Sequence, residues 1–203
     1  NFATAAECDK VLFMIIAGLG NPGTEYKNTR HNTGRLVLEI FHQKNDLPDW
    51  KENKKFKSLV CESKIGKTKI SLFLPETFMN KSGEAISKLI KSKKAAEDLV
   101  VIHDDLDLPL GRFKISFNRG TGGHRGVSSI IKALKTEAFT RIRVGISPKK
   151  KPTGEQVVVD FILGEFKTKE LEILKKTAKK ISEAIETIVK EGREKAMGKY
   201  NSL

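Results

Sequence analysis

The chain has 203 residues, of which 38% are hydrophobic and 31% charged, and this length and composition are typical of one well-packed globular domain. No apolar run approaches the roughly 20 residues that a membrane-spanning helix needs, so we expect no membrane segment. The 38 basic and 25 acidic residues give a net charge of +13, which favours a polyanionic partner such as nucleic acid over a basic surface that serves only solubility.

Residues 1–11 do not begin with methionine, and we expect them to be a poorly ordered N-terminal extension of a single domain that spans residues 12–203. Cys8 and Cys61 show neither the spacing of metal ligands nor the framework of a disulfide-rich secreted protein. This cysteine usage fits a reducing compartment, and we therefore expect a cytoplasmic protein.

An apolar run over residues 11–17 predicts a buried strand, and Gly-Leu-Gly-Asn-Pro-Gly follows it from residue 18. The three glycines match the pattern G-x-G-x-x-G of dinucleotide-binding proteins. Clear helical periodicity begins only near residue 34, however, whereas a dinucleotide-binding helix opens within the glycine turn, so nicotinamide binding is the weaker interpretation. Asn21 and His31 follow this strand, at the sheet edge where α/β proteins usually bind ligands.

Strands and helices are expected to alternate along the rest of the chain. Apolar residues at helical spacing predict helices capped by Asn32 or Thr33, capped by Ser82, after the loop of residues 120–126, and over residues 168–191. Strands are predicted as a hairpin of residues 56–63 and 68–74, a buried strand over residues 99–102, and strands around residues 113–117 and 142–146. This order predicts a single three-layer αβα domain with a twisted mixed sheet.

The buried strand of residues 99–102 is followed by His103, Asp104 and Asp105. If it lies beside the first strand, a histidine meets an aspartate at one sheet edge, and such a pair suits general-base catalysis. Each histidine can instead be a buried residue that is hydrogen-bonded to the backbone. The chain has no pair of residues with metal-ligand spacing and no nucleophile elbow, so we expect no metal site and favour attack by an activated water.

The glycine-dense loop of residues 120–126 contains His124 and Arg125 and precedes a helix. Its backbone N–H groups can cradle a phosphate, although a loop of this composition can also be merely mobile. Basic side chains would surround this loop if the strands predicted before and after it are adjacent in the sheet. Any one of these side chains alone is better explained as an ordinary surface charge. These are Lys114, Arg119, Arg141, Arg143 and Lys149–Lys151.

Six segments, in order along the chain, resemble the motifs of the bacterial-type peptidyl-tRNA hydrolase family. The first begins with the glycine turn at residue 18 and continues through Tyr26 to Thr-Arg-His-Asn at residues 29–32. The others are Pro-Glu-Thr-Phe-Met-Asn-Lys-Ser-Gly (75–83), His-Asp-Asp-Leu-Asp-Leu-Pro (103–109), Gly-Gly-His-Arg-Gly (122–126), Arg-Ile-Arg-Val-Gly-Ile (141–146) and Phe-Ile-Leu-Gly-Glu-Phe (161–166). The family usually has asparagine where this chain has Arg125.

The resemblance implies a cofactor-free, usually monomeric esterase that releases peptides from peptidyl-tRNA that has dropped off the ribosome, and so recycles tRNA for translation. It implies that His31 is the catalytic base and Asp104 its orienting partner. Asn21 and Asn80 would hold the substrate and the water. The expected contacts with the peptide and the tRNA are Tyr26, Phe78, Met79, Lys114, His124, Arg125, Arg141 and Arg143.

The alternative is an RNA-binding protein without catalysis on the same scaffold, as in organellar splicing factors that resemble the hydrolase. A binding module has no need of a general base. The joint presence of His31, Asp104, Asn21 and Asn80 therefore favours the enzyme.

Overall fold

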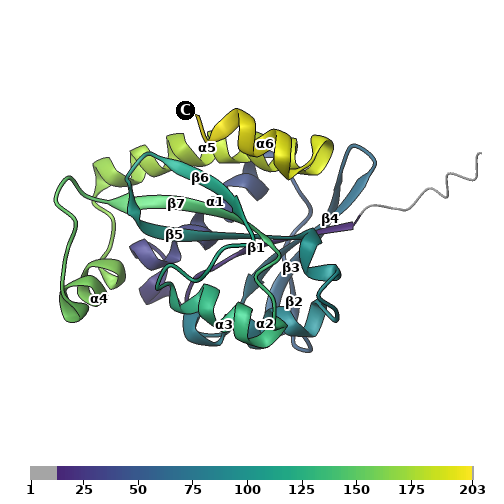
Figure 1. Ribbon diagram of the computed structural model, residues 1–203, viewed down its shortest axis with the longest axis horizontal. Helices are drawn as coiled ribbons and strands as arrows, with labels where there is room; N and C mark the ends of the chain where they lie inside the picture. The colour runs from purple at the N-terminus through teal and green to yellow at the C-terminus, as the bar shows by residue number, and fades with distance from the viewer. Residues whose placement is uncertain (1–12, 203) are drawn as a thin grey trace, which may run out of the picture.

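The computed structural model describes residues 13–202, so the predicted N-terminal extension and Cys8 lie outside the described residues. Its strands are β1 (Phe13–Gly18), β2 (Lys51–Asn53), β3 (Ser58–Ile65), β4 (Thr68–Pro75), β5 (Leu99–Pro109), β6 (Phe113–Phe117) and β7 (Thr140–Ser147). Its α-helices are α1 (Thr33–Lys44), α2 (Ser82–Leu89), α3 (Arg125–Leu134), α4 (Glu155–Leu163), α5 (Thr168–Glu191) and α6 (Arg193–Tyr200). The seven strands form one mixed sheet in the order β2-β3-β4-β1-β5-β7-β6, with helices on both faces (Figure 1), which confirms the predicted αβα domain.

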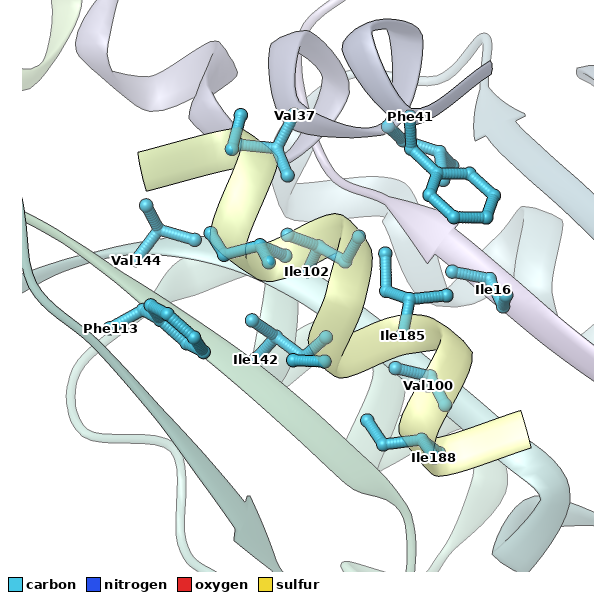
Figure 2. Close-up of a cluster of buried hydrophobic side chains, with 14 of the residues drawn as sticks. Ile16, Val37, Phe41, Val100, Ile102, Phe113, Ile142, Val144, Ile185 and Ile188 are labelled. Carbon is cyan, nitrogen blue, oxygen red and sulfur yellow. The ribbon is translucent and has the colours of Figure 1, made fainter. Parts of the chain in front are cut away.

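The central strands are covered on both faces, so alternate residues belong to two different cores. Ile16 and Ile102 pack with α1, α5 and α6 in one core, and Figure 2 shows side chains of this core packed between the helices and the sheet. Ile15 and Val101 pack with α2 and α3 in the other core. Because both faces of β1 and β5 are buried, these strands read in the sequence as continuous apolar runs.

The pairing of the central strands brings two chain segments to one edge of the sheet. β1 pairs in parallel with β4 and β5, and β5 pairs in parallel with β7. Gly18 at the end of β1 is level with Ile102 in β5, as expected if the two strands are neighbours. The predicted hairpin is confirmed as the antiparallel pair β3 and β4, and β6 and β7 are also antiparallel.

The first turn of α1 lies unusually close to the strands, and two glycines make this approach possible. A Cβ atom at Gly34 would lie 2.1 Å from the backbone oxygen of Ile102, and one at Gly18 would lie 2.6 Å from the oxygen of Gly34. Backbone hydrogen bonds hold the contact, because Leu19 N donates to Ile102 O and Arg35 N donates to Leu19 O. The residues just before α1 are therefore carried to the end of β5.

The structure differs from the predicted strands mainly in β5. This strand continues past the apolar run to Pro109, because β7 supplies backbone partners for His103, Asp104 and Asp105 and, after a shift in register, for Pro109. Polar residues at the end of a central strand are thus held as rigidly as its buried core. The short edge strand β2 was not predicted.

The long helix predicted over residues 168–191 is confirmed as α5. Two other helices, α4 and α6, were not predicted: α4 has no buried residue, and α6 buries only Ala196 and Tyr200, so neither shows a distinct apolar stripe. Across residues 13–202, no helix combines the length and the apolar character that a bilayer span requires.

The predicted N-cap position of α1 is confirmed, whereas the predicted cap of α2 is wrong by one residue. Asn32 occupies the N-cap position of α1, but its side chain makes no capping bond and instead binds the backbone of Asn21. Ser82 is the first residue of α2, and its hydroxyl donates to Met79 O at 2.8 Å. Asn32 thus ties the start of α1 to the loop after β1, and Ser82 ties α2 to the 3₁₀ turn that precedes it.

Candidate active site

A cleft with a volume of ≈ 1410 Å³ opens at the carboxyl ends of β1 and β5. Its lining includes Asn21 after β1, Asp104 on β5 and His124 before α3. His31 also lines it, from the 3₁₀ turn Arg30–Asn32 (η2) that leads directly into α1. The close approach of α1 to β5 therefore places an imidazole beside the polar end of a central strand.

Asp104 joins two histidines that lie far apart in the sequence. Nδ1 of His31 is 3.1 and 3.0 Å from the two carboxylate oxygens, and Nε2 of His124 is 2.9 Å from Oδ1. The exposed fractions of the His31, Asp104 and His124 side chains are 7%, 5% and 8%. The contact between His31 and Asp104 was expected if the two strands were neighbours. The contact between His124 and Asp104 was not predicted, because the glycines before His124 leave the path of the loop undefined.

Electrostatics set the charge of this cluster. Burial by itself would lower the pKa of His31, but the charge of Asp104 and the hydrogen bond to it together prevail, and the pKa is raised above its ordinary value. Burial would raise the pKa of Asp104, but the two histidines prevail and hold it well below its usual range. Asp104 is therefore ionised at neutral pH and accepts the hydrogen of His31 Nδ1, which leaves a lone pair on His31 Nε2.

His103 is not part of this cluster. Its Nδ1 donates to the backbone oxygen of Asp104 at 2.7 Å, and its ring packs against that of His124 with centroids 4.6 Å apart. Burial lowers the pKa of His103 well below its ordinary value, and the positive charge of Arg141 acts in the same direction. His103 is thus the neutral buried histidine that the sequence left open as an alternative.

Asn21 is held firmly on three sides. Its backbone N–H donates to Asn32 Oδ1 at 2.8 Å, and Asn32 Nδ2 donates back to the backbone oxygen of Asn21 at 2.9 Å. Its side-chain oxygen accepts from Met79 N at 2.8 Å. Because the oxygen is used, the amide NH₂ group keeps its hydrogens for a ligand in the cleft. The supporting role of Asn32 was missed because this residue was assigned to the helix cap.

The 3₁₀ turn Met79–Lys81 (η3) and the residue before it form one side of the cleft. Phe78, Met79 and Asn80 all line it, and Phe78 is 55% exposed although it is a large hydrophobic residue. Tyr26 does not line the cleft, but its ring packs edge-on against Phe78 with centroids 6.4 Å apart. Tyr26 therefore supports an apolar side chain at the cleft.

Helix α4 contributes an apolar wall that the sequence analysis did not identify. Figure 1 shows this helix set apart from both helical layers at one end of the sheet. The α4 residues with apolar side chains that line the cleft are Val158, Val159, Ile162 and Leu163. The sequence does contain a helix-length segment with several apolar residues here, and none of them is fully buried in the structure. Exposed apolar residues of this kind indicate a binding surface.

Basic side chains gather at the other side of the cleft, on β6, β7 and their loops. Those that line it are Lys114, Arg119, Arg125, Arg141, Arg143 and Lys151. The strand register places Lys114 opposite Arg143, so both share one face of the sheet. Arg143 Nε donates to Asp105 Oδ2 at 2.6 Å and Arg141 Nη1 donates to Gly120 O at 2.9 Å, which holds both arginines in place. The exposed Lys149 and Lys150 do not line the cleft.

An ion pair spans the mouth of the cleft. Arg125 begins α3 and Glu155 begins α4, and Arg125 Nη2 lies 3.6 Å from Glu155 Oε1. Both side chains are exposed, so this pair stabilises the fold little, and a charged ligand can replace it. The positive charge of Arg125 also acts against the protonation of His31.

The segment that carries His31 is anchored to the distant end of the chain through Arg30. Arg30 Nη2 donates to Glu170 Oε2 at 2.8 Å, and its guanidinium lies 4.3 Å from the ring centroid of Phe161 and 5.4 Å from that of Phe166. Its backbone N–H donates to Gly164 O at 3.1 Å. The turn before α1 is thus fastened to the junction of α4 and α5.

Two histidines and an aspartate can also be metal ligands, and the ligand atoms of His31, Asp104 and His124 lie within 4.8 Å of one another. The hydrogen bonds do not suit a metal, however. His124 Nδ1 accepts from the backbone N–H groups of Gly126 and Val127, so the hydrogen of this ring is on Nε2. A metal needs a lone pair on that nitrogen, and the cluster is therefore built for hydrogen bonding.

Comparisons with known proteins identify the family of this chain. A family model described as peptidyl-tRNA hydrolase matches residues 15–203. The peptidyl-tRNA hydrolases of Thermotoga petrophila and Carboxydothermus hydrogenoformans are each 44% identical to the chain, over 94% and 93% of its length and 98% of theirs. The crystal structure of peptidyl-tRNA hydrolase from Acinetobacter baumannii is 29% identical, with a TM-score of 0.85 over 94% of this chain and 95% of that one. The chain therefore belongs to the peptidyl-tRNA hydrolase family of enzymes.

Proposed function

We propose that His31 is the general base with which this enzyme hydrolyses the ester bond of peptidyl-tRNA, the bond between a peptide carboxyl group and a ribose hydroxyl. The observation that supports this role most strongly is the contact of Asp104 with His31 Nδ1 at 3.0 Å, which leaves Nε2 as the basic atom of a residue that lines the cleft. Asp104 also stabilises the imidazolium that forms when Nε2 takes a proton.

In the proposed reaction, Nε2 of His31 removes a proton from a water molecule as the water oxygen bonds to the ester carbon. The carbonyl oxygen becomes an oxyanion, and the NH₂ group of Asn21 stabilises it, a contribution of about 3 kcal/mol in comparable sites. The bond between the carbon and the ribose oxygen then breaks, and Nε2 returns its proton to the ribose oxygen. The products are a peptide with a free carboxyl group and a tRNA with a free hydroxyl.

The two sides of the cleft suit the two halves of this substrate. Phe78, Met79 and the apolar wall of α4 offer contacts to a peptide, with Tyr26 behind Phe78 and Asn80 beside it. The opposite side offers positive charge to the phosphates of the tRNA acceptor end. The residues proposed to bind tRNA are Lys114, Arg125, Arg141 and Arg143.

Arg125 changes one contact of the cleft relative to the usual asparagine of the family. An arginine only donates hydrogen bonds, so it does not reproduce the acceptor of an amide. Its exposed guanidinium, 3.6 Å from Glu155, is instead placed to bind a phosphate or the terminal nucleotide of the tRNA.

We further propose that residues 12–203 act as one domain and as a monomer in the cytoplasm, without a metal or another cofactor. General-base attack by water needs only groups that the cleft already provides, His31, Asp104 and Asn21. Because the substrate supplies its own polyanion, a basic monomer can bind it without a partner protein.

The test is the release of labelled N-acyl-amino acid from N-acyl-aminoacyl-tRNA, measured beside aminoacyl-tRNA that lacks the acyl group. The wild-type protein should cleave the acylated substrate alone. His31→Ala should lose most turnover and keep its affinity for tRNA, because the imidazole acts on the water and not on the nucleic acid.

Unchanged turnover in His31→Ala would contradict the assignment of the base. Tight tRNA binding by the wild-type protein without any cleavage would instead indicate an RNA-binding protein on this scaffold, and Arg125→Asn would then be the first variant to test for restored activity.

A further inference from the structure

His124 caps helix α3 in an unusual way. Its Nδ1 accepts hydrogen bonds from two backbone N–H groups of the first helical turn, those of Gly126 at 3.1 Å and Val127 at 3.2 Å. Helix N-caps are normally Ser, Thr, Asp or Asn, which accept these bonds through a side-chain oxygen. Here a ring nitrogen performs the same task, and this fixes where the ring carries its hydrogen.

The cap determines the tautomer of His124. A nitrogen that accepts from two N–H groups has no hydrogen of its own, so the hydrogen is on Nε2, which lies 2.9 Å from Asp104 Oδ1. A second proton, on Nδ1, would face the hydrogens of Gly126 and Val127 and break the cap. His124 is therefore a neutral donor to Asp104.

His31 has the opposite tautomer. It donates to Asp104 through Nδ1 and keeps the lone pair of Nε2. Asp104 thus receives one N–H group from each histidine, but only His31 offers a basic nitrogen to the cleft. The ring centroids of the two histidines are 5.0 Å apart, so a proton on His124 would repel the imidazolium that His31 forms during the reaction.

We propose that His124 is a positioning residue, which acts as a permanently neutral donor that holds the Asp104 carboxylate toward His31 and fastens it to the first turn of α3. This inference rests on the proposed role of His31. It gives His124 a task other than the tRNA contact expected from the family resemblance. Asp104 is 4% exposed, so each N–H group that it receives stabilises a carboxylate that water barely reaches.

Two substitutions separate the tasks of the ring. His124→Asn keeps an acceptor near the position of Nδ1, and asparagine is a good N-cap, but it has no atom that reaches Asp104. His124→Gln keeps an N–H donor near the position of Nε2 but has no acceptor for the cap. The pair therefore removes the bond to Asp104 and the helix cap one at a time.

We expect His124→Asn to lower kcat by about 10- to 100-fold, the range of one hydrogen bond to a charged group, with KM for N-acyl-aminoacyl-tRNA and the melting temperature nearly unchanged. His124→Gln should retain more of kcat and lose thermal stability. The acid limb of the pH profile should move to higher pH in His124→Asn, because Asp104 on β5 then has more charge to offer His31, while Arg125 on α3 is unchanged.

Three results would overturn the proposal. An unchanged kcat in His124→Asn would leave the ring as a cap only, and a raised KM with unchanged kcat would make it a tRNA contact. A loss as complete as that of His31→Ala, together with a flat pH profile, would make it the base. If His31→Ala itself kept its turnover, the proposed function would fail instead, so the two failures are distinguishable.

A measurement on the wild-type enzyme does not depend on the folding of any variant. Nitrogen-15 chemical shifts of the histidine rings should show His124 with its hydrogen on Nε2 and His31 with its hydrogen on Nδ1. A hydrogen on Nδ1 of His124 would overturn the proposal directly.

Discussion

Asp104 is the side chain on which the chemistry proposed for the cleft depends. It receives N–H groups from His31 and His124, and its own backbone oxygen accepts from His103. A buried carboxylate is stable only when such donors surround it, and the same donors keep it ionised. One aspartate thereby selects the tautomer of His31 and leaves a lone pair in the cleft.

Asp104→Asn should lower kcat roughly 10⁴-fold, the effect of the equivalent change in a serine-protease triad. The amide NH₂ of asparagine can donate to His31 Nδ1, which then favours a hydrogen on Nε2 and removes the base. Turnover of N-acyl-aminoacyl-tRNA measures the effect. Asp98→Asn, at the opposite end of β5 and exposed, is the matched control and should behave like the wild-type enzyme. Comparable turnover in the two variants would refute the role of Asp104.

The pH dependence of kcat/KM should reveal the opposing influences on His31. In the proposed mechanism neutral imidazole is the active form, so activity should fall as the pH drops through the pKa of His31, which Asp104 raises against the effect of burial. Arg125→Asn removes a positive charge that lowers this pKa, so the acid limb should move to higher pH. The shift should shrink at high salt because Arg125 is exposed. A limb that stays in place, or moves to lower pH, would show that Arg125 does not act on His31.

The contact between α1 and β5 is the structural reason that His31 reaches Asp104. Neither helix propensity nor hydrophobic periodicity predicts this contact, because it consists of glycines and backbone hydrogen bonds. Gly34 is the tightest point, because the atoms nearest to an added Cβ belong to the backbone of Ile102 and Leu19, which cannot rotate away.

Gly34→Ala should therefore destabilise the fold by about 3 kcal/mol and lower kcat, because the helix must move and carry η2 with it. Chemical denaturation and turnover measure the two effects. Gly198→Ala in α6 is the control, since its added Cβ meets nothing within 4 Å, and it should be neutral or stabilising by up to about 1 kcal/mol. A Gly34→Ala protein as stable as the wild type would contradict this close packing of α1 on the strands.

The elements that the sequence predicted well are those whose apolar residues recur with a clear helical or strand period. The α5 stripe and the hairpin of β3 and β4 are examples. The end of β5 was not predictable in this way, because β7 extends it through polar residues whose partners lie about forty residues later. Helix α4 was missed for a related reason. Most of its apolar residues line the cleft and none is fully buried, so no stripe separates a buried face from an exposed one.

The candidate site was predictable to the extent that it depends on neighbouring strands. Two apolar runs predicted two buried strands, and the sequence indicated that His31 would meet Asp104 if these strands were neighbours. The pairing of β1 with β5 fulfils that condition. The position of His124 depends on a glycine-rich loop in which Gly122 and Gly123 have positive φ, and no periodic pattern in the sequence predicts such a path. The hydrogen bonds between the Asn32 side chain and the backbone of Asn21 are likewise not predicted by any periodic pattern.

The chain has a large net positive charge, and several of its basic side chains line the cleft at one edge of the sheet. The net charge of +13 attracts tRNA from any direction, but the basic side chains of β6, β7 and their loops lie at the cleft itself. Long-range attraction and local binding of phosphates differ in their response to salt, because each phosphate that a basic side chain neutralises releases counterions.

Lys114→Ala combined with Arg119→Ala should weaken tRNA binding and reduce the slope of log K against log salt by about 1.5, which is about 0.8 for each phosphate that is no longer neutralised. Lys176→Ala with Lys180→Ala changes the net charge equally at exposed positions of α5 and should leave the slope nearly unchanged. Titrations at several salt concentrations distinguish the pairs. Equal slopes for both pairs would show that overall charge, and not binding at the cleft, controls affinity.

The anchor of Arg30 has a consequence for how each copy of the enzyme is made. His31 leaves the ribosome early, whereas the partners of Arg30 on Phe161 and Glu170 follow 131 and 140 residues later. During that interval the growing chain is itself a peptidyl-tRNA, joined to its tRNA by the bond that this enzyme cleaves. In the proposed mechanism the site is complete only when Asp104, His124 and α5 have emerged, so a chain that stops before Asp104 lacks the partner that orients the proposed base.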